Sequence, residues 1–392
     1  MNMKMLTRVK FSVNCWLTLS LMELRDVYIM EIQAALRRLE SNLKTFLYDS
    51  DDAYIKNLLS MGRSEVEANR LACWDWPHGV GLYGMYKQYL LTKDAAILDV
   101  LEHWYDTRIA FGLPQKTVNT VAPLLTLAFL YEKRPKQAYR TILLQWGEWI
   151  MDEMVRTVEA GLQHRHAELE NPGELWDDTL FMTVLFLAKA GTVFDIPSYR
   201  EEAKYQVLLH ITYLLDTKTS LYFHAWSFER NDNFARALWG RGNGWITMFI
   251  PEFLDILSCD EATERFLRTR LVRQLQSLCK YQDASGLWHT LIDDESSYLE
   301  ASGSAGFCYG LYKAIGKGYV DSSYLPYARK ALQALLERID AQGRLGDVSY
   351  GTNVGKDLEH YRSIRLQTMQ YGQGMAMLAL VEALQEAQAG IL

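Results

Sequence analysis

The chain has 392 residues, of which 49% are hydrophobic and 23% charged, and its formal net charge is −7. Such a composition is typical of a globular protein that can bury its own core without disulfides. The negative charge argues against a general nucleic-acid binder, which needs a basic face, and no apolar run approaches the roughly 18 residues of a membrane span.

The first residues imitate a weak signal peptide. Three basic residues precede an apolar stretch within residues 1–22, but Asn14 interrupts that stretch and no small-x-small cleavage site follows. We therefore interpret residues 1–25 as an N-terminal extension of uncertain status and residues 26–392 as one domain. The five cysteines are widely spaced and form no CxxC pair, which favours buried free thiols over a zinc site.

Two kinds of helical pattern alternate along the chain. Amphipathic helices are predicted at 27–48, 95–109, 135–154, 197–215, 260–281 and 322–339. Helices that are apolar on all sides are predicted at 78–91, 122–131, 179–190, 245–257, 305–315 and 375–384. A helix with one charged face lies at the protein surface, whereas a helix that is apolar on all sides is buried. The pattern predicts an all-α fold, an (α/α)6 barrel of six inner and six outer helices, with an open solenoid as the alternative.

The connections between these helices are unequal. Long segments rich in His, Trp, Tyr and Asp precede inner helices, at 161–173, 217–236, 286–300 and 343–369. The polar segment 49–65 is also expected to be a connection, whereas the turns at the other ends of the helices are short. Because sites are usually built on long loops at one rim of a scaffold, we expect the functional site at the long-loop rim.

Two acids stand directly before the third inner helix. Asp177 and Asp178 are adjacent, and adjacent helical residues point about 100° apart, so one of them is expected to face the barrel centre. The other, with Asp177 the better candidate, is expected to cap the helix N-terminus. The inward acid is then free to act as a general acid or base, and Trp176 beside it should lower the local polarity and raise its pKa.

Other segments offer binding groups. The segment Trp239–Trp245 (WGRGNGW) is not a phosphate loop, because no strand precedes it and it has no lysine. Its glycines could permit tight packing, or Arg241 could grip a planar carboxylate beside a stacked ring. His164 and His166 have no acidic partner nearby in the sequence, so we expect no metal site. Asp75 supplies a further acid beside an aromatic platform.

These segments together resemble glycoside hydrolase family 105, the unsaturated rhamnogalacturonyl hydrolases, a relative of the family 88 unsaturated glucuronyl hydrolases. The resemblance lies in Trp74–Gly84, Glu174–Met182, Trp239–Trp245 and Gly303–Phe307. It runs in the same order from about residue 30 to about residue 385, and it implies an (α/α)6 barrel. That fold agrees with the helical repeat found independently.

The resemblance also implies a reaction. Such an enzyme hydrates the C4=C5 bond of an unsaturated galacturonyl residue at the non-reducing end of a pectin fragment and releases the next sugar, rhamnose. Asp178 falls on the family's catalytic acid. Asn119 stands where some relatives carry a second functional Asp, so Asp178 would bear more of the chemistry. The expected substrate-binding residues are Asp75, Trp76, Asn119, His164, Trp176, His224, Trp239, Arg241 and Trp245.

Two alternatives remain open from the sequence. One is a family-88-like hydrolase of glycosaminoglycan or other unsaturated uronides, which would share Asp178 and differ in the subsite for the next sugar. The other is a non-catalytic carbohydrate-binding barrel, which would keep the tryptophans and tolerate loss of Asp178. No cofactor is implied, and the expected partner is a small unsaturated oligosaccharide, with neither nucleic acid nor membrane. The resemblance favours the cytoplasm, and the oligomeric state is not readable.

Overall fold

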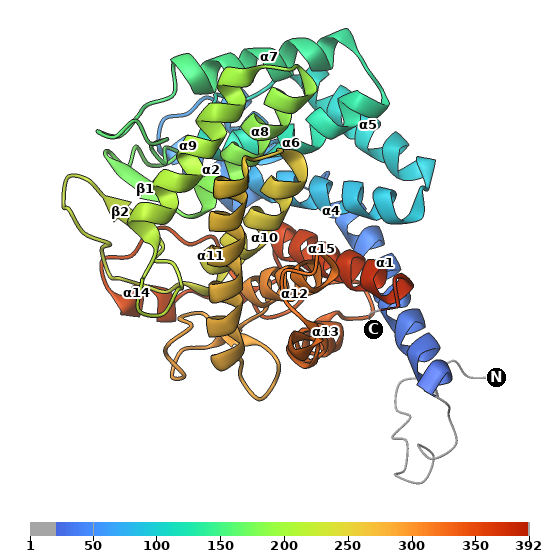
Figure 1. The fold of residues 1–392 in the computed structure, drawn as a ribbon. Helices are drawn as coiled ribbons and strands as arrows, with labels where there is room; N and C mark the ends of the chain where they lie inside the picture. Colours follow the sequence, from blue (N-terminus) through green and yellow to red (C-terminus); the bar gives the residue numbers. More distant parts are fainter. Residues whose placement is uncertain (1–20, 50, 391–392) are drawn as a thin grey trace.

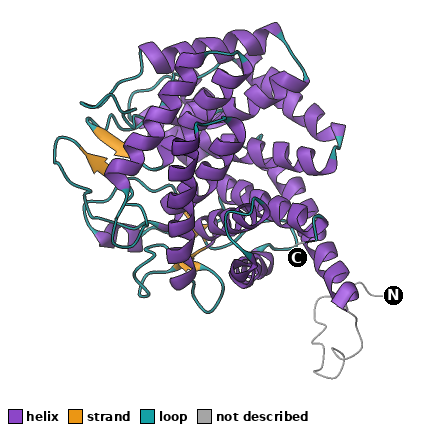
Figure 2. Ribbon diagram, viewed as in Figure 1, coloured by secondary structure: helices purple, strands orange, loops and turns teal. Residues whose placement is uncertain are grey.

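The computed structural model describes residues 21–49 and 51–390, and most of the expected extension 1–25 lies outside these residues. The first helix begins at Leu21, earlier than the expected position 27. Helices dominate the described chain, and the few short strands lie among its loops (Figure 2). No helix among these residues is long and apolar enough to cross a membrane.

The helices form two concentric rings (Figure 1). The inner ring contains α4 (Trp76–Thr92), α6 (Val118–Lys133), η1 (Leu180–Val184) continued by α8 (Leu185–Val193), α10 (Gly240–Ile256), α12 (Ala301–Gly316) and α15 (Gln370–Gln388). The outer ring contains α1 (Leu21–Phe46), α5 (Ala95–Phe111), α7 (Gln137–Asp152), α9 (Pro197–Leu214), α11 (Glu261–Lys280) and α13 (Leu325–Arg338).

The inner ring is closed. Each inner helix packs against the next, and the last, α15, packs against the first, α4. The N-terminal helix α1 packs against α15 from the outer ring (Figure 1). This arrangement confirms the predicted (α/α)6 barrel and excludes the open solenoid, in which the first and last repeats do not meet.

Burial explains why the two kinds of helix separate. Every residue of α12 from Ala301 to Ile315 is buried, whereas α11 buries mainly the face that carries Leu267, Leu271, Leu275 and Leu278. Neighbouring inner helices approach very closely where both carry glycine. A Cβ on Gly306 would lie 2.9 Å from the Cα of Gly244 in α10, so side chains there would force the ring apart.

Three local predictions were wrong. Segment 49–65 is not a simple connection, because α2 (Asp52–Ser60) occupies it and is followed by α3 (Glu65–Cys73). Its polar composition hid a helix that is anchored mainly through Leu58. The third inner helix opens with the five-residue π-helix η1 in place of a regular α-helical turn. Helix α10 starts at Gly240, so the WGRGNGW segment forms its first turns.

Three short antiparallel strand pairs tie the long loops together before the inner helices. They are β1 (Glu174–Trp176) with β2 (Ala225–Ser227), β3 (Trp288–His289) with β4 (Leu299–Glu300), and β5 (Val348–Ser349) with β6 (Leu366–Gln367). Strands β1, β4 and β6 each lie shortly before an inner helix. The pairs therefore fix the rim on which the expected site residues lie. The described cysteines are free, as expected, but the expectation of burial holds for Cys308 and not for Cys73, Cys259 and Cys279, which are half-buried.

The inner helices are joined by a buried charge cluster toward their C-terminal ends. The carboxylate of Glu252 in α10 accepts hydrogen bonds from the hydroxyls of Tyr83 and Tyr309, and Lys87 lies 2.8 Å from it. Lys313 lies 3.8 Å away on α12. Burial alone would raise the pKa of Glu252, but the two lysine charges outweigh it and lower the pKa to about 2. The cluster thus stabilises the fold at neutral pH and loses that effect as the pH falls toward 2.

Replacing Glu252 by alanine should strongly destabilise the barrel. The change leaves Lys87 and Lys313 with a buried charge that has lost a partner, which we expect to lower the free energy of unfolding by about 3–5 kcal/mol. Urea unfolding followed by circular dichroism measures the loss. The control is Asp195→Asn, whose side chain is 91% exposed beside Arg200. Asparagine tolerates the left-handed backbone of this position (φ 51°), so the change should cost at most about 1 kcal/mol. Equally small losses in both variants would contradict the proposed role of the cluster.

Candidate active site

One cavity of about 680 Å³ lies at the long-loop rim, where the N-terminal ends of the inner helices converge. Every expected site residue except His224 lines it: Asp75, Trp76, Asn119, His164, Trp176, Asp178, Trp239, Arg241 and Trp245. These residues come from helices α4, α6 and α10, from strand β1 and from loop positions outside these elements, and they are far apart in the sequence. The residues expected at this rim therefore line one cavity, and its functional role stays a prediction.

Asp178 is the acid of the Asp177–Asp178 pair that faces the cavity. Its side chain is 17% exposed, and Oδ1 is buried without a hydrogen-bond partner. Burial raises its pKa to about 7, and the charge of Arg241 opposes that shift. The expected direction of the pKa shift is thus confirmed. A carboxyl group with such a pKa is substantially protonated at neutral pH and can serve as a proton donor.

Asp177 does not cap the helix, so this expectation was wrong. Its side chain is fully buried, and neither carboxyl oxygen accepts a hydrogen bond. The backbone N–H of Asp177 instead donates to the carbonyl of His224, 3.0 Å away, as an extension of the β1–β2 pairing. Burial and the charge of Asp178 both raise the pKa of Asp177 well above its ordinary value.

Two histidines flank the acids. His164 stacks on Trp176 with ring centroids 4.3 Å apart and an interplanar angle of 3°. Its Nδ1 lies 2.8 Å from the hydroxyl of Thr179 and 3.8 Å from Oδ1 of Asp178. Burial lowers the pKa of His164 well below its ordinary value. The ring is therefore neutral and acts on Asp178 through polarity, not through charge.

His224 lies behind the cavity wall. Its ring packs on Trp239 with centroids 4.2 Å apart, and Nδ1 lies 2.9 Å from the hydroxyl of Tyr361. Burial lowers its pKa well below the ordinary value, so this ring is neutral too. Because Tyr361 engages Nδ1, the free Nε2 is left to face the acids.

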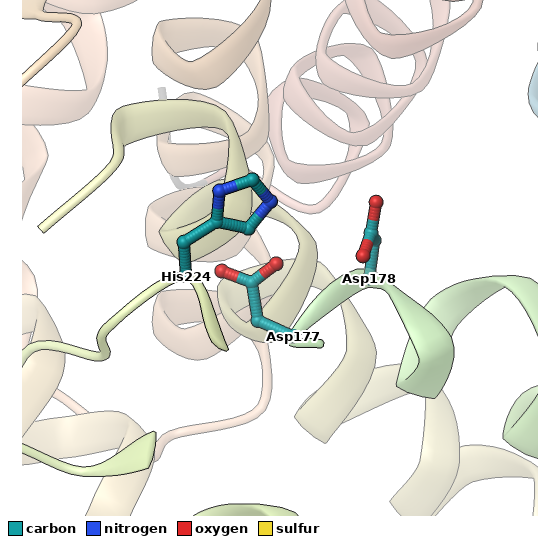
Figure 3. Close-up of side chains that lie close together, drawn as sticks. All are labelled: Asp177, Asp178 and His224. Carbon is teal, nitrogen blue, oxygen red and sulfur yellow. The ribbon is translucent and has the colours of Figure 1, made fainter. Parts of the chain in front are cut away.

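Figure 3 shows Asp177, Asp178 and His224 side by side, with one polar atom of each within 4.8 Å of the others. Among the described residues, this is the group of acids and histidines whose spacing would also suit a cation. We assign no metal ligand here, because a cation needs ionised carboxylates and burial favours the protonated form of both acids. The absence of a cofactor stays a prediction.

Arg241 is buried at the edge of the cavity, with 1% of its surface exposed. Its guanidinium donates to the carbonyl of Ser349 at 2.9 Å, to the carbonyl of Tyr350 at 3.1 Å and to the hydroxyl of Thr352 at 3.0 Å. These bonds hold the loop after β5 over the cavity. Contact with a substrate carboxylate stays a prediction for this residue.

Aromatic rings form one wall of the cavity. Trp76 stacks on Tyr371 with centroids 4.4 Å apart and meets Trp245 edge-on at 6.1 Å. The guanidinium of Arg241 lies between the rings of Trp239 and Tyr371, 4.6 and 4.9 Å from their centroids. Flat apolar surfaces of this kind suit the apolar face of a sugar ring.

Asp75 and Asn119 lie at the starts of the first two inner helices. Asp75 caps α4 through the N–H of Trp76 at 2.8 Å, and its Oδ2 accepts a bond from the hydroxyl of Tyr54 at 3.1 Å. Burial raises the pKa of Asp75 to about 7. Asn119 lies in the first turn of α6 and contributes an uncharged amide to the wall.

Sequence reasoning missed several lining or supporting residues. Tyr54 belongs to the unpredicted α2, and Tyr361 to α14 (Leu358–Arg362), which lies inside a long connection. Neither has a local pattern that could have revealed it. Tyr371 could have been found, because it opens the last inner helix in the same way as Trp76 opens the first.

Comparisons with known proteins agree with this geometry. A family model described as Glycosyl Hydrolase Family 88 matches residues 51–387. The unsaturated rhamnogalacturonyl hydrolase YesR of Bacillus subtilis is 34% identical over 314 residues, 79% of this chain and 90% of that protein. A crystal structure of a possible family 105 member from Salmonella enterica is 44% identical, with a TM-score of 0.85 over 91% of this chain and 94% of that one. This chain belongs to glycoside hydrolase family 105, a relative of family 88.

More distant members share the fold alone. The unsaturated glucuronyl hydrolase of Bacillus sp. GL1, described as responsible for glycosaminoglycan degradation, is 17% identical. Its TM-score is 0.66 over 92% of this chain and 97% of that one. The two proteins thus share the barrel scaffold.

Arg241→Lys should loosen the loop over the family 105 site. A lysine keeps the charge but cannot reach Ser349, Tyr350 and Thr352 together. Losing these charge-assisted bonds should speed amide hydrogen exchange at 348–353 by about tenfold or more. The control is Arg268→Lys on the exposed face of α11, which should leave that exchange unchanged. Unaltered exchange in Arg241→Lys would show that these bonds do not hold the loop.

Proposed function

We propose that the protein is an unsaturated rhamnogalacturonyl hydrolase that acts on a 4,5-unsaturated galacturonyl residue at the non-reducing end of a pectin fragment. The observation that carries the proposal is the carboxyl of Asp178, which lines the cavity with a pKa of about 7 and with Oδ1 free of hydrogen bonds. Burial also raises the pKa of Asp75 to about 7, but its carboxyl is held by the N–H of Trp76 and the hydroxyl of Tyr54. Ordinary glycosidases need two carboxyls on opposite sides of the scissile bond. Hydration of an enol ether needs one group that first gives a proton and then takes one back.

The proposed reaction starts with Asp178 as the acid. Its proton adds to C4 of the unsaturated uronate, and the positive charge that develops at C5 is shared with the ring oxygen. Water attacks C5 and loses a proton to the Asp178 carboxylate, which restores the acid. The resulting hemiketal opens to a ketone, and the former glycosidic carbon releases the next sugar. One water is consumed and no cofactor is needed.

The wall of the cavity supports a neutral leaving sugar. Among the described residues that line the cavity, Arg241 is the only arginine and there is no lysine. The N–H groups of Arg241 already bind the loop after β5. The acidic lining residues are Asp49, Asp51, Asp52, Asp75, Glu168 and Asp178. A sulfated amino sugar would meet the like charges of Asp49, Asp51 and Asp52 there, whereas rhamnose offers hydroxyl donors to the lining acids. The similarity to YesR supports the same choice.

The test of the function uses the ultraviolet absorbance of the conjugated C4=C5 uronate. An unsaturated galacturonyl–rhamnose disaccharide should lose this absorbance and release rhamnose. Loss of absorbance on an unsaturated chondroitin disaccharide alone would transfer the protein to the glucuronyl hydrolases. No loss on either substrate would contradict the proposal.

Asp178→Asn should abolish activity and leave the fold intact. The amide cannot donate the proton to C4, and general acid catalysis is typically worth about 10²–10⁴-fold in rate. The absorbance assay and circular dichroism measure the two effects. The control is Asp195→Asn at an exposed position just beyond the C-terminal end of the third inner helix, which should keep the wild-type rate. More than a few percent of wild-type rate in Asp178→Asn would contradict the assignment.

The activity should fall as the pH rises through about 7, the pKa of Asp178. The donor is protonated below this value and ionised above it, so kcat/KM should show a descending alkaline limb. A pH series of initial rates measures the limb. A profile that stays level well above neutrality would show that no group with this pKa supplies the proton.

A further inference from the structure

The carboxyl group of Asp177 has no part in the reaction above, yet the structure makes a closed slot for it. The side chain has no exposed surface, and neither oxygen has a hydrogen-bond partner. The slot exists because position 242 is glycine: a Cβ there would lie 1.9 Å from Oδ2 of Asp177. The ring of Trp239 closes another side.

The charged and titratable groups around this slot do not offset the burial of an ionised Asp177: the charge of Arg241 lowers its pKa, but burial and the charge of Asp178 raise it. Arg241 acts on it by charge, but its terminal N–H groups donate to the loop after β5. His224 is neutral because it is buried. Burial raises the pKa of the Tyr361 hydroxyl, so this group is neutral too. The backbone N–H of Asp178 also favours the charged form, but burial outweighs it. An ionised carboxylate that is buried with so little to compensate it is costly, which favours the carboxylic acid.

A neutral carboxylic acid needs an acceptor for its O–H. Two polar atoms are within 4.8 Å of the Asp177 carboxyl, an oxygen of Asp178 and a ring nitrogen of His224 (Figure 3). Nε2 of His224 and Oδ1 of Asp178 are both buried and without a partner. Catalytic hydrogen bonds are often long in a free enzyme and shorten when substrate is bound.

We propose that Asp177 is kept as a neutral carboxylic acid that donates its O–H to the carboxylate formed when Asp178 gives its proton to the substrate. This proposal rests on the proposed function. Asp177 keeps its own proton throughout, and water returns the other proton to Asp178, so the cycle balances. A carboxylic acid held neutral in an apolar site to act as a donor is a known catalytic device. Because Asp177 does not line the cavity, it is a positioning residue.

The kinetic test compares Asp177→Asn with Asp177→Val. The amide is neutral and still donates, so Asp177→Asn should keep kcat within about threefold and leave the alkaline limb of the pH profile in place. Valine cannot donate, so Asp177→Val should lose about tenfold or more in kcat with KM unchanged.

Either of two results would overturn the proposal. Wild-type kcat in Asp177→Val would mean that the acid only fills space. An alkaline limb moved to lower pH in Asp177→Asn would mean that Asp177 is ionised and acts by repulsion. If Asp177→Val does not fold, the position of the alkaline limb in Asp177→Asn still tests whether Asp177 is neutral. The control is Glu386→Gln, which removes another buried carboxyl with an unpartnered oxygen at the far end of α15 and should leave kcat and the limb unchanged.

A second measurement needs no substrate and so separates this proposal from the proposed function. The infrared difference between wild type and Asp177→Asn is recorded at about pH 8, well above the ordinary pKa of an aspartic acid. We expect the carbonyl band of a protonated carboxyl in wild type that the variant lacks. Absence of this band overturns the proposal even if the enzyme hydrolyses the disaccharide as expected.

Discussion

The removal of two neighbouring carboxyl groups from water is the constraint on which the site depends. Asp178 keeps one edge open to the cavity, whereas Asp177 is closed off entirely. In this environment the charged form of each acid is disfavoured, so a residue that is ordinarily ionised becomes a proton donor at neutral pH. The surrounding histidines, being neutral, add polarity without adding the charge that would cancel the effect.

The barrel supplies the rigidity that this environment requires. The β1–β2 pairing sets Asp177 against the segment of His224, and Gly242 on α10 leaves the space for its carboxyl. Arg241, one residue earlier on α10, ties the loop after β5 over the same cavity. Three segments that are remote in sequence thus meet around one turn, while the buried charge cluster at Glu252 holds the inner helices together farther down.

The sequence was informative where a local pattern determines the structure. Full apolar burial of α12 against one-sided burial of α11 is a direct consequence of residue periodicity. The sequence was less informative where a tertiary contact decides. Helix α2 is polar and is buried mainly through Leu58, so its sequence resembles a loop. The π-helix η1 has the same apolar composition as an α-helix. Asp177 does not cap the helix because its backbone pairs with the segment of His224. The contact of Arg241 with the loop after β5 spans more than a hundred residues.

The most direct measurement of the central claim is the fate of the C4=C5 bond in heavy water. If Asp178 protonates C4, its exchangeable deuteron must appear as one carbon-bound deuterium at C4 of the released uronate product, which NMR detects. Asp178→Asn should give no such product. Release of rhamnose with the C4=C5 bond intact and no deuterium on carbon would mean ordinary hydrolysis at the glycosidic carbon, and would contradict the account.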